Sequence, residues 1–256
     1  MFRTGLIVAT CFFSSAFAQP QPVTVTSAAS ASAGLAPESL ATVSGENLAT
    51  GTVSIPRPPW PTAAGGVTVQ VTDSASVTRA AGLLLVSSAQ INFEIPAGTA
   101  PGPATVLINN GGAPVSVPVR IEATAPALFS VNELGLAAAT AISLVIPTRI
   151  QSPVPVVECA ATPASCRLTP ISLGVDTPIY LTFYGTGIRG RSSLENVTVT
   201  IGTVDIAPTY AGSQPGTPGL DQVNVPLFLS LRGAGEVSVT VTVDGVKSNP
   251  VKINVL

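Results

Sequence analysis

The sequence has no histidine and only two lysines, and just 9% of its 256 residues are charged, against about 25% in an ordinary soluble domain. Without histidine the chain cannot build a triad with an imidazole base, a His-ligated zinc site or a histidine proton relay. Lys247 and Lys252 both lie close to the C-terminus, which argues against Schiff-base chemistry and against a polybasic surface. We therefore expect no cofactor, no metal and no nucleic-acid partner.

The N-terminus has the pattern of a secretory signal peptide. Arg3 precedes an apolar stretch over residues 5–13, and Ser14–Ala18 ends in a small-x-small cleavage motif. We predict cleavage after Ala18 and a secreted or cell-envelope protein. The apolar stretch is too short to span a bilayer, and the uncharged residues 95–119 are interrupted by proline and glycine. No membrane span is expected in the mature chain.

Cysteine is scarce as well. Removal of the signal peptide would take away Cys11 and leave Cys159 and Cys166. An even, local pair in an exported protein predicts a structural disulfide, and two thiolates without a nearby histidine fall short of a zinc site.

What the sequence does contain is short runs of Val, Ile, Leu and Thr with period two, separated by Gly, Pro, Asn and Asp. The clearest runs are Val67–Val71, Ile91–Ile95, Val197–Ile201 and Val237–Val243. Alternation of this kind is typical of half-buried antiparallel strands. No convincing amphipathic helix occurs, so the pattern predicts an all-β protein.

The chain also repeats itself. Residues 66–69 match 196–199 at a spacing of 130, while 90–93 match 222–225 and 117–121 match 249–253 at 132. Two copies of one β unit of this size predict tandem immunoglobulin-like β-sandwiches.

The predicted organisation follows from the repeat. It is a signal peptide over residues 1–18, a first sandwich over 19–124, a connector over 125–172 and a second sandwich over 173–256. Within the connector we expect an inserted hairpin, formed by Leu136–Ile146 and Pro153–Glu158 and tied by the disulfide.

Five ordered motifs carry a resemblance to a known family. They are Ser87–Pro96, Gly102–Val106, Ala125–Phe129, Tyr184–Arg191 and Gly219–Pro226. Together they resemble an uncharacterised β-rich domain family at the C-termini of secreted acidobacterial proteins, whose halves are similar to IPT/TIG immunoglobulin-like modules. The resemblance covers roughly residues 24–256 and implies export and a tandem sandwich. It implies no activity and no catalytic residues. Relatives usually place this unit after a larger passenger, whereas here almost nothing separates the predicted signal peptide from it.

Gly185–Gly190 has the glycine spacing of a dinucleotide-binding loop and follows an apolar strand. That motif needs a helix whose amide groups meet the pyrophosphate, whereas the downstream residues alternate as a strand. We therefore predict a glycine-rich turn between strands. Arg189 and Arg191 in this turn are candidate contacts for an anion or an acidic sugar, or solvated loop arginines.

Trp60 is the third candidate contact. It lies in a proline-rich segment, where its indole could stack on a sugar or a partner, or pack over the end of the first sandwich. Gln90 and Gln222 begin runs whose polar side chains share one face, which indicates an outward sheet face, amides that bond adjacent loops, or a ligand surface.

Three hypotheses for function follow. The leading one is a non-enzymatic exported module for interaction or structure, whose partner is an unknown protein or polysaccharide at the cell surface. The first alternative is a carbohydrate-binding protein or glycan-acting enzyme that uses carboxylates and Trp60. The second is an outer-membrane β-barrel, against which the few aromatic residues and the short strands argue.

Overall fold

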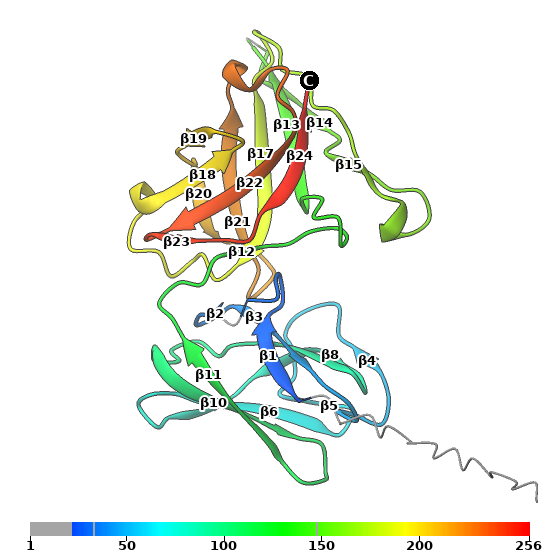
Figure 1. Ribbon diagram of the computed structural model, residues 1–256, viewed down its shortest axis with the longest axis vertical. Helices are drawn as coiled ribbons and strands as arrows, with labels where there is room; N and C mark the ends of the chain where they lie inside the picture. Colours follow the sequence, from blue (N-terminus) through cyan, green and yellow to red (C-terminus); the bar gives the residue numbers. More distant parts are fainter. Residues whose placement is uncertain (1–21, 33, 147) are drawn as a thin grey trace, which may run out of the picture.

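The computed structural model describes residues 22–32, 34–146 and 148–256, which form strands and three short 3₁₀ turns but no α-helix. This confirms the predicted all-β class. The predicted signal peptide, the predicted cleavage site after Ala18 and Cys11 lie outside the described residues. Two β-sandwiches stand end to end along the long axis (Figure 1), each with its own buried apolar cluster.

The first sandwich packs two sheets face to face. One has the order β1 (Thr24–Ser27), β3 (Leu40–Ser44), β9 (Gln90–Glu94), β8 (Gly82–Val86) and β4 (Val53–Ser54). The other has the order β2 (Gly34–Leu35), β11 (Val115–Ile121), β10 (Gly102–Asn109), β6 (Val67–Thr72) and β5 (Ala63–Ala64), with β7 (Thr78–Ala80) also paired to β6. Alternate residues such as Val69 and Phe93 point inward and are fully buried.

The second sandwich is built in the same way. Its β17–β21 sheet has the order β14 (Ile150–Val154), β13 (Ala139–Val145), β17 (Ile179–Thr186), β21 (Asp221–Leu227) and β20 (Tyr210–Ser213), with β12 (Ala127–Leu128) on β17. Its β18–β22 sheet has the order β19 (Val204–Ile206), β18 (Val197–Ile201), β22 (Gly235–Val243) and β23 (Val246–Lys247), with β24 (Val251–Val255) on β22. The 3₁₀ turns are η1 (Pro163–Ser165), η2 (Leu194–Asn196) and η3 (Leu229–Leu231).

The strand registers support the internal repeat. Gln90 lies opposite Ser44 in β3, and Gln222 lies opposite Tyr184 in the same position of β17. Val69 likewise lies opposite Ile108, as Val199 lies opposite Val241.

The third sequence match is two residues out of register. Val117 pairs with Val106, and the residue in the same place on β24 is Val251, which pairs with Val239. Asn249, which the sequence match aligned with Val117, precedes β24. The sequence match superimposed Pro118 on Pro250, although these two prolines do not occupy the same place in the two sandwiches.

The prediction of a separate connector over residues 125–172 is wrong, because this segment belongs to the second sandwich. β13 lies inside the β17–β21 sheet, next to β17, in the place that β1 takes next to β3. Ile171 bridges Val255 in parallel, as Leu35 pairs with Ile121. Leu128, Ala137 and Ile171 are buried in the core of this sandwich.

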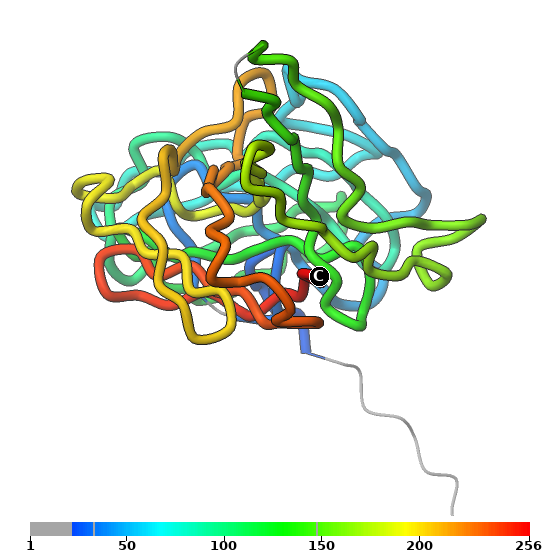
Figure 2. Tube along the Cα trace, turned by 90° about the horizontal axis from the view of Figure 1, so that it is seen from above, coloured from blue at the N-terminus to red at the C-terminus, as the bar shows by residue number. Residues whose placement is uncertain are grey.

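The inserted hairpin exists, but its second strand begins earlier than predicted, at Ile150. The disulfide between Cys159 and Cys166 joins a different pair of strands, β15 (Val157–Glu158) and β16 (Arg167–Leu168), and its Cα atoms lie 3.9 Å apart. The segment from β15 to β16 projects from the side of the second sandwich (Figures 1 and 2).

The corrected boundary makes a direct prediction. A fragment of residues 173–256 lacks β12, β13 and the buried Ile171, so we expect it to show no cooperative thermal unfolding. A fragment of residues 125–256 retains the whole core cluster, and we expect it to unfold cooperatively in circular dichroism. Cooperative unfolding of the shorter fragment would return the boundary to residue 172.

Candidate functional site

The glycine-rich turn that the sequence singled out lies at the junction between the two sandwiches. The linker over residues 122–127 passes against the glycine-rich turn that follows β17. The Ala125 amide donates to the Gly187 carbonyl oxygen at 2.9 Å. A Cβ on Gly187, whose φ is +73°, would lie 2.1 Å from the Ala125 oxygen, and one on Gly190 would lie 2.4 Å from the Ala123 oxygen. These glycines allow two backbone segments to touch.

The same turn confirms that residues 185–190 are no dinucleotide loop. β17 ends at Thr186, and the next regular element is the 3₁₀ turn η2. The glycines serve close backbone packing, and none of them begins a helix.

A threonine connects the halves from inside the junction. Thr186 is fully buried; its hydroxyl accepts from the Leu40 amide at 2.8 Å and donates to the Gly219 carbonyl at 2.7 Å. A Cβ on Gly219 would lie 2.5 Å from the Leu40 Cδ2 atom. The start of β3 in the first sandwich is therefore seated directly on the second.

Arg189 and Asp221 form the charged centre of the junction. The Asp221 side chain is 0% exposed and that of Arg189 is 14% exposed. The Arg189 Nε atom donates to Asp221 Oδ1 at 2.7 Å, and the Ile188 amide donates to Oδ2 at 2.7 Å. Arg189 also donates to the Leu220 carbonyl at 2.8 Å and lies 3.5 Å from Glu38 of the first sandwich.

Burial raises the pKa of Asp221 above its ordinary value, and the Arg189 charge and the amide donors oppose that shift. Glu94, at the end of β9, also has a raised pKa, first because of burial; Arg189 lowers it and Glu38 raises it. Three carboxylates of both sandwiches thus share the field of one guanidinium.

The structure separates the three predicted contact residues. Arg189 is engaged in the junction. Arg191 lies beside β20, where a Cβ on Gly212 would lie 3.3 Å from its Nη1 atom. Trp60 is half-buried in the first sandwich against β8, since a Cβ on Gly82 would lie 3.2 Å from the Trp60 Cβ atom. No common site brings them together.

Sequence reasoning missed Asp221, Thr186 and Gly219. Asp221 stands in the second repeat where Ala89 stands in the first, since both precede the paired glutamines. A charged residue in one copy of the repeat, at a position where the other copy has alanine, was the signal that could have identified Asp221.

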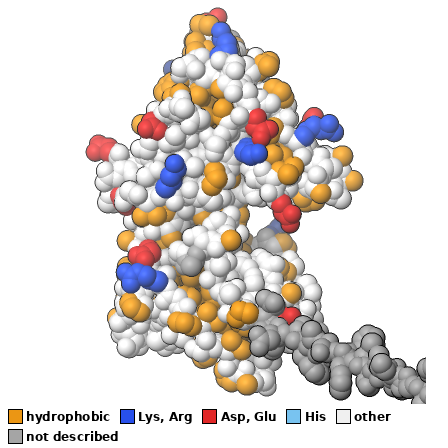
Figure 3. Space-filling view, in the orientation of Figure 1, with side chains coloured by type: hydrophobic (Ala, Val, Ile, Leu, Met, Phe, Trp, Pro, Cys, Tyr) orange, Lys and Arg blue, Asp and Glu red, His pale blue; other side chains and the backbone are white. Residues whose placement is uncertain are grey.

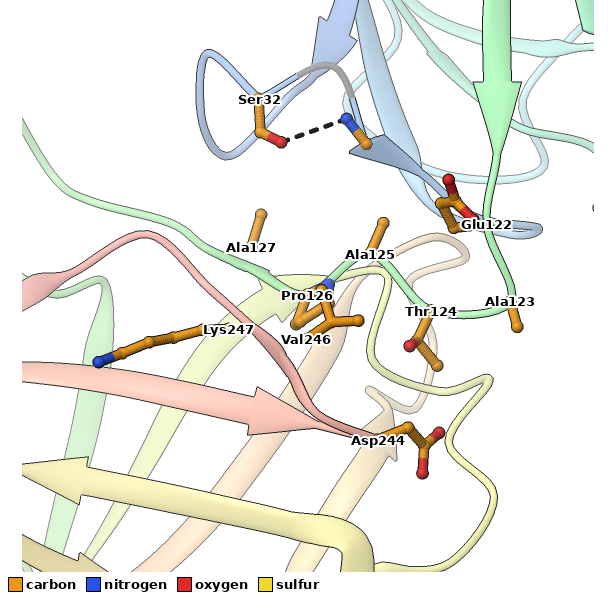
Figure 4. A pocket seen from close by; sticks show the side chains of 11 residues that line it. Ser32, Glu122, Ala123, Thr124, Ala125, Pro126, Ala127, Asp244, Val246 and Lys247 are labelled. Carbon is orange, nitrogen blue, oxygen red and sulfur yellow. Dashed lines mark hydrogen bonds between the residues drawn. The ribbon is translucent and has the colours of Figure 1, made fainter. Parts of the chain in front are cut away.

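A groove of about 420 Å³ opens beside the linker. Figure 4 shows Glu122 and Thr124 on the linker side, Asp244 on the turn before β23, and Lys247 extending away from both acidic side chains. The polar groups do not converge on one point. The Asp244 carboxylate accepts hydrogen bonds from the Ser192 amide at 2.9 Å and from the Ser192 hydroxyl. These hydrogen bonds lower the pKa of Asp244.

Asp73 is a further carboxylate with a shifted pKa, and its hydrogen bonds hold together the loops around it. Amide donors of Ala100 and Val77 lower the pKa of Asp73 to about 2, and Arg79 pairs with it at 2.5 Å. Among the described residues, no three His, Cys, Asp or Glu side chains come together as a metal site. Charged side chains are few and scattered on the face in Figure 3.

Comparison with known proteins gives structural neighbours only. No family model matches the chain, and no curated protein matches it. A structure described as the S-layer protein SbsC, domains 5-6, is similar at 15% identity and a TM-score of 0.28, covering 93% of this chain and 98% of that one. A structure of surface layer protein SbsC, domains 4-9, is similar at 14% identity and a TM-score of 0.28; the match covers 93% of this chain and 31% of that one.

The described part of the chain holds no helix with the length and apolar character needed to cross a membrane.

Removal of the Arg189 side chain should be costly and dependent on pH. Arg189→Ala leaves the buried Asp221 carboxylate without its ion pair, which should lower the free energy of unfolding by about 3 kcal/mol at neutral pH. A carboxyl with a raised folded pKa is favoured by folding in its protonated form, so its contribution to stability increases as the pH falls through that pKa and is lost as the pH rises.

The loss in Arg189→Ala should therefore shrink in mildly acidic solution, which denaturant titrations across pH will measure. Arg120→Ala is the control, because Arg120 and Glu122 pair at the surface with side chains 65% and 45% exposed, and it should change little. A loss in Arg189→Ala that stays the same across pH would contradict this account of Asp221.

Proposed function

We propose that this protein is an exported, non-enzymatic module for structure and interaction, in which two β-sandwiches are presented outside the cell as one fixed unit. The observation that carries the proposal is the use of the buried Asp221–Arg189 pair. Its polar atoms are directed to the backbone and to Glu38 of the other sandwich, so the most deeply buried charges maintain a domain junction and leave none free for a substrate.

Two further observations support export. The Cys159–Cys166 disulfide is of the kind that persists in oxidising compartments. The predicted signal peptide over residues 1–18 would direct the chain there. The resemblance to the C-terminal domain family of secreted acidobacterial proteins agrees with this location, and its five motifs include residues of β9, β10, β12, β17 and β21.

The alternative in which Trp60 and carboxylates act on a glycan has less support. Trp60 is half-buried, and the Asp73, Asp221 and Asp244 carboxylates are held in scaffold hydrogen bonds. We therefore propose no catalytic residue.

The fixed junction is tested by a pair of glycine variants. Gly187→Ala would drive a methyl group into the Ala125 carbonyl, so we expect faster protease cleavage within residues 122–127 and a broader distance distribution in small-angle X-ray scattering. Gly111→Ala is matched in backbone strain, with a φ of +86° and nothing within 4 Å of the added Cβ, and should leave both measurements unchanged. A wild-type protein whose halves already tumble independently would refute the fixed unit.

Export is tested by mass spectrometry of the chain recovered from the medium or the cell envelope of the native organism. We expect an N-terminus at Gln19. A chain that retains Met1 would contradict the predicted cleavage and the proposed location.

A further inference from the structure

The outer face of the β17–β21 sheet gathers all three tyrosines of the chain. Tyr180 and Tyr184 alternate on β17 with the buried Leu181 and Phe183, so they point away from the core, and each is partly exposed. Tyr210 on β20 precedes the buried Ala211 and lies on the same face. Tyr184 and Tyr210 are two strands apart, which is about 10 Å across the sheet.

The strand registers place uncharged polar groups between these rings. Thr140, Thr182, Asn224 and Tyr210 form one continuous row across four strands. Gln222 lies in the next row, opposite Tyr184. None of the outward residues on the fully described strands β17, β20 and β21 is charged.

Two buried polar atoms on this face have no partner in the described part of the chain: Oδ1 of Asn224 and Nε of Arg191. A Cβ on Gly212, which pairs with the outward Gln222, would lie 3.2 Å from the Tyr210 hydroxyl and 3.3 Å from Arg191 Nη1. Arg191 therefore lies over β20 beside Tyr210. Buried polar groups without partners are costly, so a small shift of the neighbouring side chains that gave these two atoms a partner would be favourable.

The first sandwich provides an internal comparison. Asn92 is the counterpart of Asn224, and its Oδ1 atom accepts from Thr42 at 2.9 Å and from Gln90 at 2.7 Å. The strands β3 and β9 carry no tyrosine. In the first copy the polar groups of this sheet face bond one another, whereas in the second copy the face is aromatic and two of its buried polar atoms are unpaired.

A hollow adjoins the tyrosine face at its β13 edge. It has a volume of about 490 Å³ and is lined by Thr140 and Tyr184, by Pro155 just before β15, and by Cys159 of the projecting segment. The disulfide-bonded segment therefore forms a wall on one side of an otherwise open sheet.

We propose that this face, formed by Tyr180, Tyr184, Tyr210, Gln222, Asn224 and Arg191, binds an uncharged polysaccharide chain. A pyranose ring presents apolar C–H groups to an aromatic ring face and hydroxyl groups at its edge. The tyrosines supply the ring faces, and the amides, the hydroxyls and Arg191 supply both donors and acceptors for those hydroxyls. The proposal rests on the proposed interaction role and names the partner class.

The chemistry of the face favours a glycan over a polypeptide or an acidic ligand. An acidic ligand would call for several cations, whereas the described outward residues of β17, β20 and β21 carry no charge and Arg191 is the one cation of the proposed face. A peptide added by strand pairing would use a free sheet edge, whereas the tyrosines lie on a face. Amides and hydroxyls interleaved with rings suit a neutral polyhydroxylated chain.

The test uses the mature protein and a defined panel of cello-oligosaccharides, xylan, mannan, β-1,3-glucan and insoluble chitin. We expect binding to at least one of these glycans by affinity electrophoresis, sedimentation or calorimetry. Tyr184→Ala and Tyr210→Ala should each weaken it about tenfold, which corresponds to the loss of one stacking contact of about 1.4 kcal/mol. Asn224→Ala should weaken binding without lowering the thermal unfolding temperature, because its Oδ1 atom has no protein partner.

The matched control is Gln90→Ala in the first sandwich, compared with Gln222→Ala in the second. Only the second variant should lose affinity. Binding to no glycan of the panel, or binding that survives both tyrosine variants, would overturn the inference. The scattering and proteolysis results for the junction do not depend on glycans, so a failure here would leave the proposed fixed unit standing.

Discussion

The buried carboxylate of Asp221 is the constraint on which the junction of this molecule depends. A carboxylate removed from water is stable only where donors surround it. Here those donors are the Ile188 and Arg189 amides and the Arg189 guanidinium. Meeting that need fixes the glycine-rich turn, and the fixed turn presents Thr186 to Leu40 and Gly187 to the linker. The relative placement of two large cores thus follows from the solvation of one side chain.

The two sandwiches show how copies of one β unit diverge. Their sheets have the same strand order and register, with β1, β3, β9 and β8 matched by β13, β17, β21 and β20. On the outer face of the first copy, the side chains of Thr42, Asn92 and Gln90 form hydrogen bonds with one another. The second copy carries tyrosines and a disulfide-bonded side segment at the corresponding face, so a similar scaffold presents two different surfaces.

Much of the fold could be predicted from the sequence, because period-two alternation and turn residues are local signals. Val67–Val71 and Val197–Ile201 appear as strands with nearly the expected bounds. The start of the second sandwich could not be predicted, because β14, β15 and β16 intervene between β13 and β17 and hide the counterpart of β1. Arg189 was identified as a candidate from its loop, but its partner Asp221 is 32 residues away. Only the pairing of β17 with β21 brings the two together.

The end-to-end arrangement also has a mechanical consequence. The first strand, β1, begins at Thr24, beside the Ser44 end of β3, and the last strand, β24, ends at Val255, beside the start of β22 at the far end of the second sandwich (Figure 1). A pulling force between those points passes through the first sandwich, the junction and the second sandwich in series. At the junction the covalent linker shares this tension with the Thr186 and Arg189 contacts, so those contacts would break before the linker carried the whole force.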